Sequence, residues 1–282
     1  MSASSADVSS AARHRAGSDA PFFVALGSLG GSYVLLIVLM LAADVAFTSP
    51  LHFKQALEKP EIQYAMRLTL ISCTVSALLS LLVAIPLAYL LSRFAFPGRW
   101  LVDTAIDIPI VLPPLVIGLS LLILFHLPLG GTNLEQLIER YLGTRVTYAV
   151  PAVVLAQFAV AGAFAVQTMR VTFDQIDTRA ELVALTLGSS RRQAFFQIVL
   201  PQAWRGMIAA LTIAWARSLG EFGPILVFAG ATRMRTEVLS TTVFLELSVG
   251  QLEAAVAVSL LMVLAAMVVL GIVRVLGARV NA

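Results

Sequence analysis

The sequence predicts an all-α, polytopic membrane protein with six transmembrane helices. Of its 282 residues, 59% are hydrophobic and only 12% are charged, and the mean hydropathy is +0.91. Soluble domains carry about 25% charged residues, and a soluble domain of this size could not bury so much apolar surface. The net charge of +3 forms no basic patch, and the single cysteine cannot form an intrachain disulfide. The composition therefore argues against a soluble enzyme, a nucleic-acid-binding protein and a disulfide scaffold.

Six apolar segments are long enough to cross a bilayer, which needs about 20 apolar residues per helix. Five of them lack Asp, Glu, Lys and Arg, and the remaining one is interrupted only by Arg217 and Glu221. The segments are residues 21–43, 68–92, 108–134, 146–169, 206–232 and 254–273. The first is too long and too far from the N-terminus for a signal peptide, so we expect a retained helix over residues 21–48. The polar residues 1–20 are expected to form a flexible cytoplasmic tail.

The distribution of Lys and Arg predicts the orientation. Eleven of the 19 basic residues lie in segments on the same side as the N-terminus, seven lie on the opposite side, and Arg217 lies within a span. By the positive-inside rule, both termini are expected in the cytoplasm. Outside, Thr132 and Glu135 are spaced as a capping box and predict a short amphipathic helix.

Two short cytoplasmic helices are predicted in the loop formed by residues 174–204. Thr178 and Glu181 form the pattern of a capping box, so a helix should begin near Arg179 and end at Gly188. Ser190 and Gln193 form a second capping box, whose helix should stop at Pro201. Glu181, Ala184, Leu185 and Gly188 would share one side of the first helix. That helix could insert into a groove of a partner or lie on the lipid headgroups.

Spacing in this loop resembles a known signature. Gly188 is followed nine residues later by Ile198-Val199-Leu200-Pro201, which matches the G-x9-I-x-L-P half of the signature loop of ABC-importer permeases. The E-A-A part of that signature falls on Leu182-Val183-Ala184, with the glutamate one place earlier at Glu181. The run Ala216-Arg217-Ser218-Leu219-Gly220-Glu221-Phe222-Gly223 resembles the A-R-A-L-G-E-F-G run of molybdate-type permeases, as do Phe96-Pro97-Gly98-Arg99 and Leu112-Pro113-Pro114.

This resemblance to the molybdate, tungstate and sulfate permeases implies the type I ABC importer transmembrane fold over residues 62–275. It implies cytoplasmic ATP-binding subunits docked at the loop, an extracytoplasmic substrate-binding protein, and a second permease subunit, most simply an identical one. The transported ion would be a tetrahedral oxyanion, molybdate first, with tungstate, sulfate or thiosulfate as alternatives. The membrane would be a bacterial or archaeal cytoplasmic membrane. The residues expected to couple to the ATPase are Glu181, Ala184, Leu185, Gly188, Ser189 and Arg191.

Arg217 and Glu221 form a charged pair inside a predicted span. A charge there costs at least about 2.5–3.5 kcal/mol, so both side chains should face the bundle interior. The pair could simply fix helix packing, or it could expose a guanidinium to an anion path. Gly220, Gly223 and Pro224 would let this helix bend during gating. Likewise, Pro109, Pro113 and Pro114 either reflect irregular packing or line a path.

Motifs for catalysis and nucleotide binding are missing from the sequence. It contains no G-x-x-x-x-G-K-[ST] loop, so ATP hydrolysis is expected in a separate subunit. No cofactor or metal ligand set is evident in this chain, which argues against an integral membrane enzyme. A gradient-driven secondary transporter remains an alternative, although such proteins have inverted repeats and no internal repeat is evident here.

Overall fold

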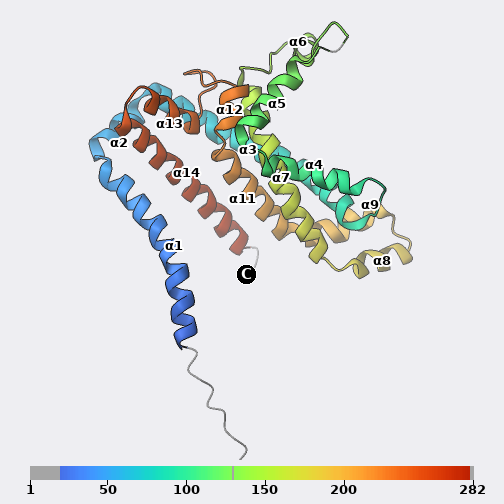
Figure 1. Ribbon diagram of the computed structural model, residues 1–282. Coiled ribbons are helices and arrows are strands. Elements are labelled where there is room, and N and C mark those ends of the chain that lie inside the picture. Colours follow the sequence, from blue (N-terminus) through green and yellow to red (C-terminus); the bar gives the residue numbers. More distant parts are fainter. Residues whose placement is uncertain (1–19, 129, 280–282) are drawn as a thin grey trace, which may run out of the picture. The chain divides into compact units, whose positions relative to one another are not determined.

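The computed structural model describes residues 20–128 and 130–279, and these are arranged in helices without strands. The described chain divides into two compact units between Phe47 and Thr48. The first contains α1 (Ala20–Phe47), which is apolar on all sides as expected of a lipid-facing helix. Residues 1–19 of the predicted tail lie outside the described residues. The other elements belong to the second unit (Figure 1).

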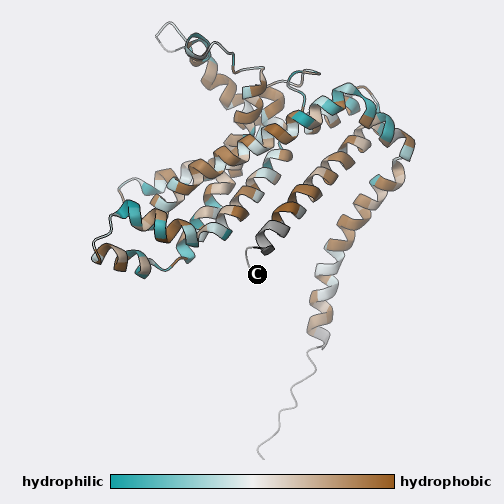
Figure 2. Ribbon diagram, turned by 180° about the vertical axis from the view of Figure 1, so that it is seen from behind, coloured by the Kyte–Doolittle hydropathy of each residue, from teal (hydrophilic) through white to brown (hydrophobic). Residues whose placement is uncertain are grey.

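The core of the second unit is formed by three helices: α3 (Pro60–Arg93), α7 (Val150–Gln175) and α11 (Trp204–Leu219). Their contact surface is rich in small side chains, because lipid supplies no hydrophobic force between helices and close backbone approach helps to hold them together. The fully buried alanines there include Ala77, Ala84, Ala88, Ala161, Ala165, Ala210 and Ala214. Figure 2 shows the long helices coloured mostly as hydrophobic, with hydrophilic segments at their ends.

The third predicted span is not a single helix. Within residues 108–134, where one proline-kinked span is predicted, the chain forms the end of α4 (Arg99–Val111) and all of α5 (Pro114–His126), bent by 118° at the break between them. Leu112 between them is extended, with φ −66° and ψ 142°. A residue before proline is disfavoured in the helical region, and Pro113 and Pro114 follow it directly. The two prolines therefore break the span.

The fifth predicted span, residues 206–232, is also broken. α11 ends at Leu219, Gly220–Phe222 are not helical, and α12 (Gly223–Phe228) begins after them. α13 (Leu239–Ser248) and α14 (Leu252–Arg279) complete the unit. Four helices are long and apolar enough to cross a membrane, and the expected six are reached only when each bent pair is one span. The second such pair is Arg191–Gln202 with α11, bent by 69°.

Short helices connect these spans. α2 (Pro50–Glu58) precedes α3, and α6 (Leu134–Leu142) follows α5. The loop that the sequence predicts to be cytoplasmic contains α8 (Thr178–Thr186), α9 (Arg191–Ala194), the π-helical turn η1 (Phe195–Val199) and α10 (Leu200–Gln202).

Two of the three predicted capping boxes are wrong in detail. α6 is capped by Asn133 with Gln136, not by Thr132 with Glu135, because Glu135 accepts hydrogen bonds from the backbone of Val146 and Thr147 instead. α8 is capped by Asp177, whose side chain accepts from the Arg179 amide at 2.9 Å. The Ser190–Gln193 box is confirmed, with both reciprocal hydrogen bonds present.

The helix that follows Ser190 ends at Gln202, one residue after the stop predicted at Pro201. Helical structure continues from Arg191 to Gln202, since the π-turn shifts the pairing so that the Leu200 amide bonds the Phe195 carbonyl. A π-turn before a proline accommodates the missing amide hydrogen without ending the helix.

Two glycines allow the helices next to the two breaks, α5 and α12, to pack closely. A Cβ added at Gly118 of α5 would lie 2.8 Å from Pro224 Cα, and one added at Gly223 would lie 3.0 Å from the Leu115 amide nitrogen. Both contacts are with backbone atoms, which cannot move aside as a flexible side chain can. α5 and α12 therefore pack at a distance that only glycine permits.

Substitution of Gly118 by alanine should destabilise the protein by about 1–3 kcal/mol, because the added methyl group overpacks this contact. The matched control is Gly271→Ala in α14, where an added Cβ meets nothing within 4 Å; it should be neutral or stabilising, since alanine favours helix by up to about 1 kcal/mol. Thermal unfolding in detergent measures both. Equal unfolding temperatures for the two variants would contradict the close contact.

Candidate functional site

A pocket lies where the two helix breaks face each other. Its volume is about 290 Å³, and its lining comes from both breaks: Pro113, Pro114 and Leu115 on one side, and Arg217, Gly220, Glu221, Phe222 and Gly223 on the other. The sequence singled out the prolines and the charged pair separately. The structure brings Pro113 and Pro114 together with Arg217 and Glu221 around one cavity.

Arg217 and Glu221 form an ion pair, with 2.7 Å between Arg217 Nη1 and Glu221 Oε1. The predicted pairing is therefore confirmed, but the expected continuous helix face is wrong, because α11 ends at Leu219. The two side chains differ in burial: that of Glu221 is 1% exposed and that of Arg217 is 31% exposed. Arg217 also lies 5.6 Å from the ring centroid of Phe164.

Side chains from neighbouring helices bond two backbone carbonyls at and just after the end of α11. Gln157 Nε2 donates to the Ser218 carbonyl at 3.3 Å, and Ser240 Oγ at the start of α13 donates to the Glu221 carbonyl at 2.7 Å. Unsatisfied backbone groups are costly at membrane depth, so these bonds stabilise the break. Gly220 ends α11, while Gly223 and Pro224 are buried against α5. Their predicted role in gating stays a prediction.

The segment from α8 to α10, named the coupling hairpin after its predicted role, is anchored by Glu181. This side chain is buried, accepts a hydrogen bond from the Tyr89 hydroxyl and lies 3.4 Å from Arg93 Nε. Arg93 also donates to the Ile176 carbonyl at 2.9 Å. Glu181 thus joins α8 to the end of α3, and nothing in the sequence signalled these distant partners.

The other predicted coupling residues shape the turn. Ala184 is buried and Leu185 is partly buried. Gly188 has φ +90°, its amide donates to the Leu185 carbonyl, and the Ser189 amide donates to the Ala184 carbonyl. This confirms Gly188 as the residue that ends the first helix. Arg191 lies 5.3 Å from the ring centroid of Phe94.

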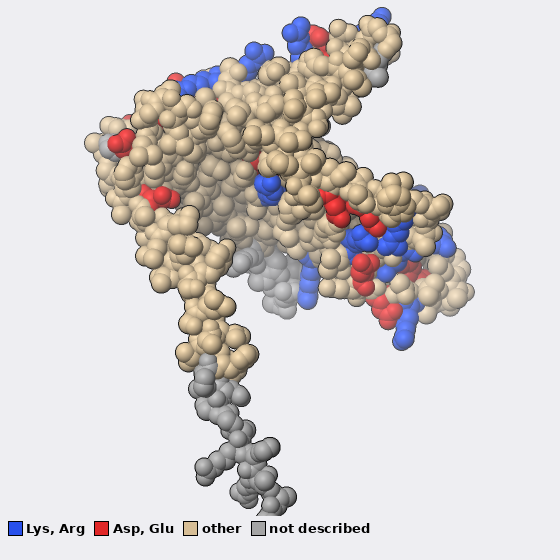
Figure 3. All heavy atoms as spheres, viewed as in Figure 1, with Lys and Arg blue, Asp and Glu red and all other residues tan. Residues whose placement is uncertain are grey.

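The free face of the hairpin is apolar. Leu182 and Val183 of α8, Leu187 directly after it, and Phe196 are large hydrophobic residues that are exposed. The sequence predicts that the side of the helix containing Glu181 and Ala184 contacts the ATPase, but in the structure both of these residues are buried against the rest of the chain. The sequence feature that could have identified the exposed face is the presence of Leu182, Val183 and Leu187 in a loop that also contains many charged residues. Figure 3 shows charged side chains gathered around the ends of the second unit, with few on its middle.

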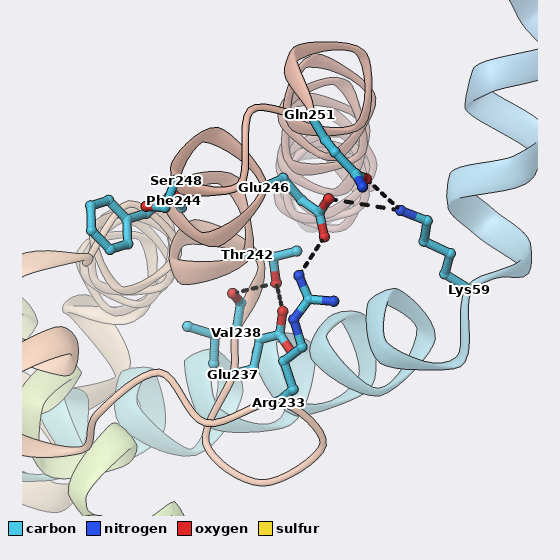
Figure 4. Close-up of polar contacts among 9 residues, drawn as sticks. All are labelled: Lys59, Arg233, Glu237, Val238, Thr242, Phe244, Glu246, Ser248 and Gln251. Carbon is cyan, nitrogen blue, oxygen red and sulfur yellow. Dashed lines mark hydrogen bonds and ion pairs between the residues drawn. The ribbon is translucent and has the colours of Figure 1, made fainter.

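A second charged cluster surrounds α13 (Figure 4). Glu246 is buried and pairs with Arg233 Nη2 at 3.0 Å and Lys59 Nζ at 3.7 Å. Buried Glu237 accepts from Thr242 Oγ1 at 3.0 Å. Glu237 lies between α12 and α13, and burial raises the pKa of its carboxyl. The cluster fastens α13 to the start of α3.

Within the described residues, no group of three or more His, Cys, Asp or Glu side chains is placed to hold a metal ion. The expectation that this chain carries no cofactor stays a prediction.

Comparisons with known proteins agree with this architecture. A family model described as "binding-protein-dependent transport system inner membrane component" matches residues 80–282. The sulfate transport system permease protein CysT of Escherichia coli (strain K12) is 31% identical over 258 residues, covering 89% of this chain and 92% of CysT. The molybdenum transport system permease protein ModB of Mycobacterium tuberculosis is 34% identical over 258 residues, covering 90% and 94%.

Two further matches extend this result. The molybdate/tungstate transport system permease protein WtpB of Pyrococcus abyssi is 34% identical over 207 residues, covering 73% of this chain and 76% of WtpB. A solved bacterial ABC transporter that imports the acidic polysaccharide alginate matches the fold with a TM-score of 0.72 at 20% identity, covering 94% of this chain and 97% of that one. The alternatives of a secondary transporter and a membrane enzyme do not fit these matches. The chain belongs to the binding-protein-dependent inner membrane components, the multi-pass permease subunits of ABC importers, in which a separate subunit hydrolyses ATP.

Proposed function

We propose that this chain moves a tetrahedral oxyanion, molybdate in the first place, across the cytoplasmic membrane of a bacterium or archaeon. The substrate class rests on the relatives at 31–34% identity, which are named for sulfate, molybdate and tungstate transport. Sulfate is the second candidate, because CysT matches over 258 residues. Both termini would be cytoplasmic, in line with the distribution of basic residues.

The observation that carries the mechanism is the apolar outer face of the coupling hairpin. Leu182 and Val183 are exposed on a short helix whose inner side is fixed by Glu181, and Leu187 is exposed directly after that helix. An apolar helix face of this kind fits a groove on a partner, and the partner is the ATP-binding subunit. Two copies of this chain and two ATP-binding subunits would form the complex. An extracytoplasmic receptor would deliver the ion, as the periplasmic protein seen in complex with the alginate transporter suggests.

Alternating access follows from the way the hairpin is anchored. Closure of the ATP-binding subunits on ATP draws the two hairpins together. Each hairpin is tied to α3 through Glu181, Tyr89 and Arg93, and it continues into α11 after a 69° bend. The movement therefore reaches the helices of the core and the pocket at the end of α11, and it switches the complex between two states.

Leu187→Arg should weaken binding of the ATP-binding subunit about tenfold or more. Burying a leucine side chain stabilises an interface by roughly 1.5–3 kcal/mol, and the substitution removes this contribution. The matched control is Tyr141→Arg on α6, since Tyr141 is 83% exposed and Leu187 is 81% exposed. Copurification from cells expressing all subunits is the measurement. Loss of the subunit in both variants, or in neither, would contradict docking at this face.

Transport itself is tested with the complex of permease, cognate ATP-binding subunit and receptor in proteoliposomes. We expect uptake of radiolabelled molybdate that requires ATP and the receptor and is reduced by excess tungstate. Uptake of sulfate with no competition by molybdate would replace the first candidate with the second. Uptake of solute without ATP, or no uptake of any oxyanion, would contradict the proposed function.

A further inference from the structure

We propose that the Arg217 guanidinium is a transient contact for the transported oxyanion within the membrane, and that Glu221 keeps this contact weak. The inference rests on the proposed function of the chain as an oxyanion permease. It assigns a binding role to the pocket between the two broken spans.

The ion pair presents its positive end to the pocket. Both residues contribute to the lining, yet the Glu221 side chain is 1% exposed while that of Arg217 is 31% exposed. The carboxylate therefore lies behind the guanidinium. Because burying a charge carries a desolvation penalty, the guanidinium that stays partly exposed is the member of the pair that can contact a ligand in the pocket.

Arg217 retains hydrogen-bond donors for a ligand. A guanidinium has five N–H groups in a planar fork, and Glu221 Oε1 is 2.7 Å from one of its nitrogens, Nη1. Among the described residues, Phe164 is the other recorded partner of this guanidinium, and it offers a ring face rather than an acceptor oxygen. The remaining donors match the oxygen spacing of a tetrahedral oxyanion.

The pocket suits such an ion in size and in composition. Its volume of about 290 Å³ has room for a five-atom anion together with water molecules. The remaining lining is mostly apolar or backbone, from Pro113, Pro114, Leu115 and the Gly220–Gly223 segment. Apart from the ion pair, these lining residues offer few polar side chains to hold an anion. Such a site suits an ion that passes through rather than one that is stored.

Glu221 explains why the site does not trap its ligand. A bare arginine in a low-dielectric pocket would hold a dianion strongly, whereas transport requires binding weak enough for release. A carboxylate 2.7 Å from Arg217 offsets much of that attraction. Since Ser240 fixes the Glu221 backbone from α13, the compensating charge has a defined position.

The test compares four variants in the reconstituted complex at saturating loaded receptor, reading molybdate imported per ATP hydrolysed. Arg217→Lys keeps the positive charge but loses the planar set of guanidinium donors, and we expect about a tenfold loss of molybdate imported per ATP hydrolysed. The double variant Arg217→Gln/Glu221→Gln removes both charges and should unfold near the wild-type temperature, yet import at least tenfold less. Glu221→Gln should retain more radiolabelled molybdate on the purified complex. The matched control is Arg233→Lys, which alters another arginine paired with a buried glutamate and should import normally.

A purely structural pair predicts different results. Wild-type import by Arg217→Lys, or by the folded double variant, would overturn the inference while leaving the proposed function intact. If the double variant fails to fold, the comparison of molybdate import by Arg217→Lys with import by Arg233→Lys tests the inference without it. Failure of the wild-type complex to import any oxyanion counts against the proposed function instead.

Discussion

The need to satisfy backbone hydrogen bonds inside the membrane shapes this protein. Hydrocarbon offers no partners, so a helix can be interrupted there only where protein or enclosed water replaces the lost bonds. The chain interrupts two spans. Gln157 and Ser240 bond the Ser218 and Glu221 carbonyls at one break. At the other, the prolines have no amide hydrogen to leave unpaired.

The remaining features of the site follow from these interruptions. Because both breaks lie at the same place, their residues line one open pocket, and glycines let α5 and α12 pack closely beside it. α13 then joins two regions. Ser240 at its beginning holds the Glu221 backbone, and Glu246 near its end pairs with Lys59 and Arg233. The intramembrane pair is thus connected, through one short helix, to the start of α3.

Much of this arrangement could be predicted because it depends on local sequence. The length of the segments without charged residues predicts the long helices. The spacing of polar residues and glycine predicts the Ser190–Gln193 cap and the turn at Gly188. The high cost of a charge in lipid predicts that Arg217 pairs with Glu221. The rest depends on contacts between distant residues. Glu181 fits a capping box, yet Tyr89 and Arg93, about 90 positions away, offer a stronger buried partnership. Likewise, consecutive prolines predict a break, but neither its 118° bend nor the packing of α5 against α12 can be read from local sequence.

The central claim, that Arg217 contacts the transported ion, requires water to reach the pocket between the broken spans. A cysteine introduced at Gly220, with Cys73 changed to Ser, tests it directly, because Gly220 lines the pocket and has space for a side chain. We expect this cysteine to react with a charged, membrane-impermeant thiol reagent and to be protected by molybdate. A cysteine at Ile213, exposed on α11 but away from the pocket lining, should stay unreactive. Equal and negligible labelling at both positions would contradict the account.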